Sequence, residues 1–275
     1  MRLQIHFAIL LLMSSLLWAC QKSDVNRGNS RLIDSILLHN NRRLQSTSGV
    51  CIGNSIVAGH PWRRSGLELG ILNYPDSFGQ ISYHLAQLTR FKWIDHGWGG
   101  QTTYEIRNRF MRDAVGDTSD PGDGRGSVTL ASRPNYAVIE GGINDIAFGD
   151  SLSAIESNLA WMASVCKQNN IRCIVLNCIG SAYGLDNTQI QMISDLNKWL
   201  ASGVLDSVQA TIVNINSLWN SGSYGGISSY GNDNIHFSSL VFQDDGVHFT
   251  RAGYDSVAHA IFRVANLMSY DSLAF

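Results

Sequence analysis

A carboxylate and an imidazole stand three residues apart near the C-terminus, in the block Asp245-Gly246-Val247-His248. At this spacing the carboxylate can accept a hydrogen bond from Nδ1–H of His248. That bond would fix the tautomer of the imidazole and stabilise the imidazolium that forms during acyl transfer. Taken alone, a pair of this kind is more often a polar contact within a loop, so its meaning depends on a nucleophile elsewhere in the chain.

A candidate nucleophile lies in the block Gly53-Asn54-Ser55-Ile56. Glycine allows a tight turn, and a serine at a junction between a strand and a loop keeps its own backbone N–H free to donate. The alternative is that Ser55 is an ordinary turn residue. A serine hydroxyl activated by His248 would perform acyl transfer through a covalent intermediate.

Two glycine-rich blocks offer hydrogen-bond donors for such a reaction. In Gly97–Thr102 the glycines let a backbone N–H approach a ligand closely, and Thr102 or Thr103 is suited to cap a following helix. The block 141–145 (Gly-Gly-Ile-Asn-Asp) carries Asn144, whose amide could stabilise a developing oxyanion. Its alternative role is an Asx-turn that holds the loop together.

Short β-rich runs alternate with amphipathic segments along most of the chain, which predicts a parallel sheet flanked by helices. The runs are apolar and largely β-branched or aromatic, as in strands that are covered on both faces. The expected strands are Gly49–Ile52, Phe91–Asp95, Tyr136–Glu140, Cys173–Asn177 and Ala210–Ile215. The first three donor or nucleophile blocks follow the first three strands, where open α/β sheets bind their ligands.

Two helices have clear apolar faces. One presents Ile155, Leu159, Met162 and Val165, and the last begins near the N-cap Thr250 and presents Val257, Ile261, Val264 and Met268, with Leu267 adjoining. Two connections, 113–134 and 219–243, are longer than usual and rich in Gly with Asp or Ser.

In this order and on these elements, the four blocks resemble those of the SGNH hydrolases, a branch of the GDSL esterase and lipase family, over about residues 50–268. The resemblance implies a three-layer α/β/α fold with a flavodoxin-like parallel sheet of about five strands. It also implies that Ser55 is the nucleophile, His248 the base and Asp245 its orienting partner. The oxyanion hole would comprise the N–H groups of Ser55 and Gly100 and the side chain of Asn144, and no metal or organic cofactor is needed.

The sequence departs from the family pattern at two positions. Asn54 stands where the family usually has Asp, and Asp95 where it usually has Asn. Asn54 is nearly isosteric with Asp and can still accept a hydrogen bond, but it supplies no negative charge. Neither departure removes a proposed triad or oxyanion group.

The N-terminus predicts export. Arg2 precedes an apolar run, Phe7–Leu17, that is short for a membrane span, and Leu17-Trp18-Ala19-Cys20 resembles the lipobox of bacterial lipoproteins. We expect residues 1–19 to be a lipoprotein signal peptide, 20–48 a tether and N-terminal segment, and 49–275 the hydrolase domain. Lipidated Cys20 would anchor the protein to a membrane, in the periplasm, at the outer membrane or at the cell surface.

The remaining cysteines and the charge restrict the partners. Cys51, Cys166, Cys173 and Cys178 match no zinc spacing, and Cys173 and Cys178 would lie about 16 Å apart along one strand, so we expect buried free thiols. With 20 basic and 22 acidic residues, net charge −2, the chain has no bulk field for nucleic acid.

The substrate expectation rests on aromatic residues near the proposed catalytic loops: Trp62, Trp98, Trp219, Tyr224 and Tyr230. Flat rings pack against sugar faces, which favours deacetylation of a small or polymeric carbohydrate ester. The alternatives are loop packing by these rings, a lipase, phospholipase or thioesterase with the same triad, and a non-catalytic surface lipoprotein that binds glycans.

Overall fold

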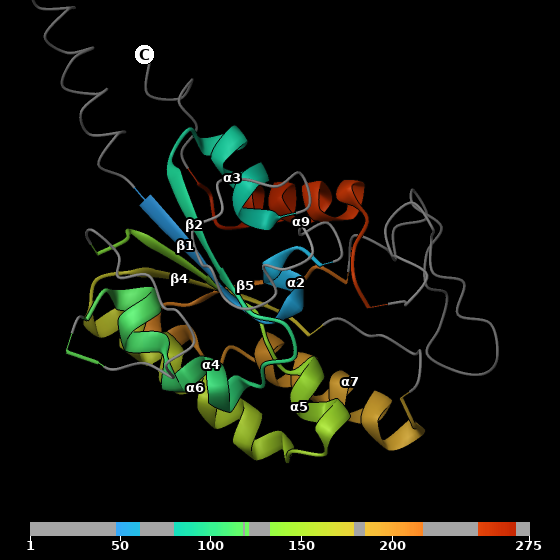
Figure 1. The fold of residues 1–275 in the computed structure, drawn as a ribbon. Coiled ribbons are helices and arrows are strands. Elements are labelled where there is room, and N and C mark those ends of the chain that lie inside the picture. The colour runs from blue at the N-terminus through green and yellow to red at the C-terminus, as the bar shows by residue number, and fades with distance from the viewer. Residues whose placement is uncertain are drawn as a thin grey trace, which may run out of the picture. The chain divides into compact units, whose positions relative to one another are not determined.

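Five parallel strands form one sheet in the order β2-β1-β3-β4-β5 (Figure 1). The computed structural model describes residues 48–60, 80–117, 119–120, 133–178, 185–216 and 247–267. The strands are β1 (Ser48–Gly53), β2 (Lys92–Gly97), β3 (Tyr136–Ile139), β4 (Arg172–Leu176) and β5 (Thr211–Val213). All five expected strands are confirmed, and the last is shorter than expected.

The direction in which the chain winds through the sheet reverses at β1. From β1 the chain passes to β2 on one side and then returns to β3 on the other side of β1. The register pairs Gly53 with Gly97 and Ile52 with Ile139, so the three carboxyl ends are level. Open α/β sheets bind ligands where the winding direction reverses in this way.

Helices cover both faces of the sheet in Figure 1. On one face lie α3 (Ile81–Thr89) and α9 (Arg251–Val264), which pack on each other. The other face carries α4 (Thr103–Asn108), α5 (Ile143–Phe148), α6 (Leu152–Gln168) and α7 (Asn187–Ala201). Short elements are α2 (Ser55–Ala58), a π-helical turn (Met111–Val115) and a 3₁₀ turn (Asp206–Val208). The three-layer α/β/α architecture is confirmed.

The core follows the predicted apolar patterns, with one error. All four apolar residues expected on the inner face of α6 are buried, and Thr250 caps α9 by accepting a hydrogen bond from the Gly253 N–H. Val264 was expected to face the core, but it is 54% exposed. The buried side of α9 passes from Ile261 to Ala265, one helical turn later, so Val264 points outward. Met268 lies outside the described residues.

A second prediction was wrong at residue 113. The expected loop from 113 to 134 begins later, because Asp113 to Val115 belong to the π-helical turn and are buried there. The four cysteines, Cys51, Cys166, Cys173 and Cys178, are buried free thiols, as expected. Among the described residues, no helix has the length and apolar character needed to cross a membrane.

Candidate active site

The structure brings Ser55 and His248 together from opposite ends of the domain. His248 Nε2 lies 2.8 Å from Ser55 Oγ, although 193 positions separate the residues in the chain. Both side chains are half-buried. This distance lets an imidazole accept the hydroxyl proton directly.

The turn that carries Ser55 is built by Asn54. The Asn54 side chain accepts a hydrogen bond from the Ile56 N–H at 2.8 Å, which caps α2 and makes Ser55 its first residue. The end of β2 packs directly beneath this helix, since a Cβ on Gly97 would lie 2.0 Å from the Ala58 nitrogen. Only glycine at position 97 allows this approach.

The loop after β2 lies alongside Ser55. The Trp98 N–H donates to the Gly53 carbonyl at 3.0 Å, and a Cβ on Gly99 would lie 4.0 Å from the Ser55 Cβ. Gly100 follows with a φ of 79° and is exposed. Gly100, proposed for the oxyanion hole, therefore belongs to the loop that borders the nucleophile.

Asn144 connects this loop to the segment after β3. Its Nδ2 donates to the Gln101 carbonyl at 2.9 Å. An amide nitrogen carries two hydrogens, and this bond uses one of them. Nearby, Asp145 accepts hydrogen bonds from the backbone N–H and hydroxyl of Thr103, while Thr102 caps α4 in a capping box with Glu105, as expected for this position.

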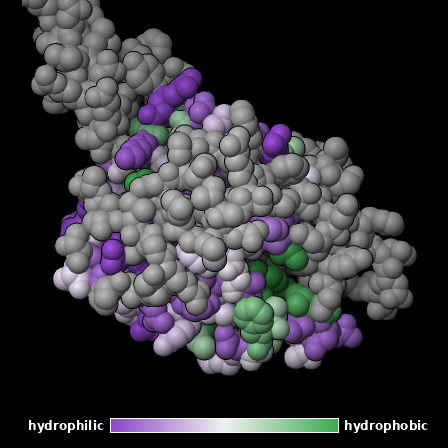
Figure 2. Space-filling model, in the orientation of Figure 1, coloured by the Kyte–Doolittle hydropathy of each residue, from purple (hydrophilic) through white to green (hydrophobic). Residues whose placement is uncertain are grey.

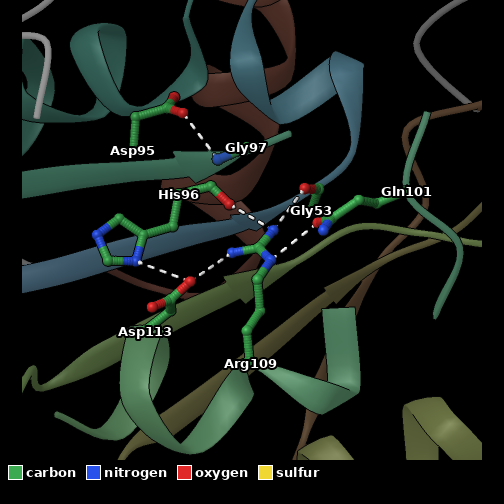
Figure 3. A network of polar contacts seen from close by, with 7 residues as sticks. All are labelled: Gly53, Asp95, His96, Gly97, Gln101, Arg109 and Asp113. Atoms are coloured by element: carbon green, nitrogen blue, oxygen red, sulfur yellow. Dashed lines mark hydrogen bonds and ion pairs between the residues drawn. The ribbon is translucent and has the colours of Figure 1, made fainter. Parts of the chain in front are cut away.

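A buried arginine that sequence reasoning missed ties these segments together (Figure 3). Arg109 Nη2 donates to the carbonyls of Gly53 (3.1 Å), the last residue of β1, and His96 (2.9 Å), the residue before last of β2. Its Nε donates to Gln101 Oε1 at 2.8 Å, and its Nη1 pairs with Asp113 Oδ2 at 2.9 Å. The four-residue spacing of Arg109 and Asp113 was the one signal in the sequence.

His96 is not an acid–base candidate, although Figure 3 shows its ring directed at Asp113. Its Nδ1 lies 3.9 Å from Asp113 Oδ2, and both side chains are fully buried. Burial and the adjacent Arg109 charge lower the pKa of His96 to about 3. The ring is therefore neutral at neutral pH.

A second histidine contacts the candidate base. The rings of His60 and His248 have centroids 4.4 Å apart. The Tyr254 hydroxyl donates to the His60 carbonyl at 2.8 Å, so α9 holds the segment after α2 in place. Nothing in the sequence distinguished His60 from a loop histidine.

A protein-family model matches most of this chain. Residues 51–255 match the GDSL-like Lipase/Acylhydrolase family, and this span includes Ser55, Asn144 and His248. The chain belongs to this family. Family membership supports hydrolysis of acyl compounds.

Solved structures of GDSL-like hydrolases and other esterases share the fold. A GDSL-like lipase from Bacteroides thetaiotaomicron is 20% identical, with a TM-score of 0.54 over 85% of this chain and 97% of that one. An acetylxylan esterase from Geobacillus stearothermophilus is 14% identical, with a TM-score of 0.55 over 80% and 94%. An α/β hydrolase from the metagenome of Lake Arreo, Spain, is 16% identical, with a TM-score of 0.55 over 82% and 97%. No curated protein matches in sequence.

The two positions at which this GDSL-like hydrolase departs from the family pattern, Asn54 and Asp95, have different hydrogen-bond partners. Asp95 Oδ1 accepts from the Gly97 N–H at 2.9 Å and Oδ2 accepts from the Ser82 hydroxyl at 3.1 Å, so this carboxylate braces the end of β2. Asn54 Nδ2 donates to Glu140 Oε1 at 3.3 Å beneath the nucleophile turn. Glu140 was not singled out from the sequence.

Several predicted site residues lie outside the described residues. They are Asp245, Trp62, Trp219, Tyr224, Tyr230 and Cys20. Trp98 is described and half-buried in the loop that borders Ser55. Within the described part of the chain, no group of three or more His, Cys, Asp or Glu side chains is arranged to hold a metal ion.

Proposed function

We propose that this protein is a serine esterase in which Ser55 is the nucleophile, His248 the general base and Asp245 the orienting carboxylate. The observation that carries the proposal is the 2.8 Å contact between Ser55 Oγ and His248 Nε2. The position of both residues at the carboxyl edge of the sheet, beside two donor loops, supports it further.

The reaction follows from these groups. His248 Nε2 takes the Ser55 proton as Oγ bonds to the ester carbonyl carbon, and the carbonyl oxygen becomes an oxyanion. The N–H groups of Ser55 and Gly100 and the Asn144 amide stabilise this charge. The imidazolium then gives its proton to the leaving alcohol, and water, deprotonated by His248, releases the acid from the acyl-enzyme.

The nucleophile is tested by labelling and substitution. Wild-type protein should react with a biotinylated fluorophosphonate at Ser55, identified by peptide mass spectrometry. Ser55→Ala and His248→Ala should each lose several orders of magnitude in ester hydrolysis. Ser151→Ala, which changes an exposed serine that caps α6, is the matched control. Undiminished turnover by pure Ser55→Ala protein would refute the nucleophile assignment.

For the substrate we propose an acetylated carbohydrate. Trp98 lies in the loop beside Ser55, where an aromatic ring can pack on a sugar face. The acetylxylan esterase that shares this fold also supports it. Acetate release from acetylated xylan or pectin, far exceeding hydrolysis of long-chain esters, is the expected result.

A lipase, phospholipase or thioesterase is the second candidate. Phe148, at the end of α5, is 69% exposed, and Tyr104, in α4, is 62% exposed. On the face drawn in Figure 2, apolar residues gather where Figure 1 draws α5 and α7. Apolar surface of this kind suits a long acyl chain. A preference for long-chain esters over acetylated carbohydrate in the same panel would select this candidate, and sugar binding without fluorophosphonate labelling would select a non-catalytic glycan binder.

We also propose that the protein is an exported lipoprotein anchored through Cys20. The apolar run before Cys20 supports this proposal. Metabolic labelling with an alkyne fatty acid in a bacterial host should modify the wild type and leave Cys20→Ala unlabelled.

A further inference from the structure

Glu140 lies directly beneath the nucleophile turn. It follows β3, and its N–H donates to the Ile52 carbonyl at 3.1 Å. A Cβ on Gly53 would lie 2.7 Å from the Glu140 carbonyl oxygen and 3.2 Å from Oε2. The side chain is 1% exposed, so the carboxyl group is enclosed under the turn that carries Ser55.

Asn54 transmits the position of this carboxyl group to Ser55. Its Nδ2 donates to Glu140 Oε1 at 3.3 Å, while its Oδ1 accepts from the Ile56 N–H at 2.8 Å. A side-chain amide has one donor end and one acceptor end. An acceptor at position 140 therefore keeps the Asn54 oxygen directed at the first turn of α2, where Ser55 begins the helix.

The surroundings of Glu140 favour the protonated form. Burial, with a smaller contribution from Asp145, raises the pKa of Glu140 to about 8, although the hydrogen bonds from Asn54 oppose the rise. Among the described residues, Oε2 has no hydrogen-bond partner. Cys178, the titratable group from the segment after β4, is a buried thiol whose own pKa is raised. Arg109, a cation that contacts this turn, is paired with Asp113.

We propose that Glu140 is a positioning residue for the nucleophile: its enclosed carboxyl group holds the Asn54 cap that presents Ser55, and the charge that it gains at alkaline pH disables the site. This inference rests on the proposed function of Ser55. Within the described part of the chain no cation pairs with Glu140, and a buried carboxylate without such a partner attracts water or a displaced donor; either response disturbs the turn. Ionised Glu140 also places a negative charge beneath the turn whose Ser55 N–H is proposed to stabilise the oxyanion.

The test is the pH dependence of Ser55 reactivity in the full-length protein. The rate of Ser55 modification by the fluorophosphonate and kcat/KM for 4-nitrophenyl acetate are measured from pH 5.5 to 10. In the wild type both should fall about tenfold per pH unit once Glu140 is ionised. Glu140→Gln keeps an acceptor for Asn54 and does not ionise, so it should retain its neutral-pH rate up to pH 10.

Two further variants separate positioning from folding. Glu140→Ala removes the acceptor and should be slow at every pH. Asn54→Asp places a second carboxylate beside Glu140, which disfavours ionisation of Glu140 and should move the alkaline limb to higher pH. Circular dichroism at each pH establishes that the alkaline loss occurs in folded protein, and the acidic limb should be the same in wild type and Glu140→Gln.

The outcomes distinguish this inference from the function on which it rests. A flat wild-type profile between pH 7 and 10, an unchanged alkaline limb in Glu140→Gln, or a loss that coincides with unfolding would each overturn the role of Glu140 while leaving a serine esterase. Absence of labelling at every pH would overturn the proposed function, and the inference with it.

Discussion

The imidazole of His60 packs against that of His248, with ring centroids 4.4 Å apart and planes inclined by 53°. His60 follows α2, the helix that begins with Ser55, and its carbonyl accepts a hydrogen bond from Tyr254 in α9. The proposed nucleophile and the ring that packs against the proposed base are therefore carried by one short segment.

Removing the ring of His60 should loosen the proposed base. Because a displacement of about 1 Å can cost a catalytic group up to about 100-fold, we expect His60→Ala to lower kcat about tenfold with little change in KM. His60→Phe keeps an aromatic ring and should retain most of the wild-type kcat. Steady-state kinetics with 4-nitrophenyl acetate measure both, and equal kcat values for Ala and wild type would contradict the role of this contact.

The amide of Asn144 should matter more for rate than for stability. Loss of one oxyanion donor typically costs about 100-fold to 1,000-fold in kcat, and we expect this from Asn144→Ala. Its bond to the Gln101 carbonyl contributes about 1 kcal/mol to the free energy of unfolding. Asn187→Ala, at the exposed start of α7, is the control. A rate loss no larger than that of the control would exclude Asn144 from the oxyanion hole.

Substitution by alanine should lower the free energy of unfolding much more at Gly97 than at Gly149. A Cβ on Gly97 would meet the Ala58 nitrogen at 2.0 Å, so α2 or β2 must move, and we expect the free energy of unfolding to fall by more than about 3 kcal/mol. Gly149 has a φ of 88° with no atom within 4 Å, so its variant should lose only about 1 kcal/mol. Urea denaturation compares the two, and similar midpoints would show that α2 does not press on Gly97.

Arg109 should be the more costly of two nearby arginines to remove. Arg109→Ala leaves the buried Asp113 carboxylate without the guanidinium, which typically costs about 3–5 kcal/mol. Arg107 donates to Asn158 at 3.1 Å and lies over the Trp161 ring, so its alanine variant should lose about 1 kcal/mol. Equal losses in urea denaturation at pH 7 would contradict the central position of Arg109.

Glu140 should make the fold less stable as pH rises. Burial raises its pKa from the ordinary 4.5 to about 8, so the folded protein binds this proton more tightly than the unfolded chain. The resulting stabilisation is complete below about pH 4.5 and is lost progressively up to about pH 8. The free energy of unfolding of Glu140→Gln, relative to wild type, should therefore increase between pH 4.5 and 8. A difference that is independent of pH would show that Glu140 titrates normally.

The sequence was sufficient for the fold class and for the strands that the proposed catalytic blocks follow. Runs such as Val50–Ile52 and Ala137–Ile139 are apolar throughout because both faces of a central parallel strand are covered, and this pattern is local. The cap at Thr250 was likewise predicted, and the cap at Thr102 was one of two residues expected there, because a cap depends on residues within one helical turn.

Only the tertiary structure revealed which side chains surround Ser55. The Arg109 bonds to Gly53 and His96, the Asn54 bond to Glu140 and the ring contact of His60 join residues that are distant in the chain or lie on different elements. From the sequence alone, an arginine or a glutamate is expected to be exposed to solvent, because most residues of these types are. The residue type does not show which of them packing will bury. The spacing of apolar residues within one segment indicates which of its faces is buried. Contacts between segments depend instead on the order in which the strands lie in the sheet.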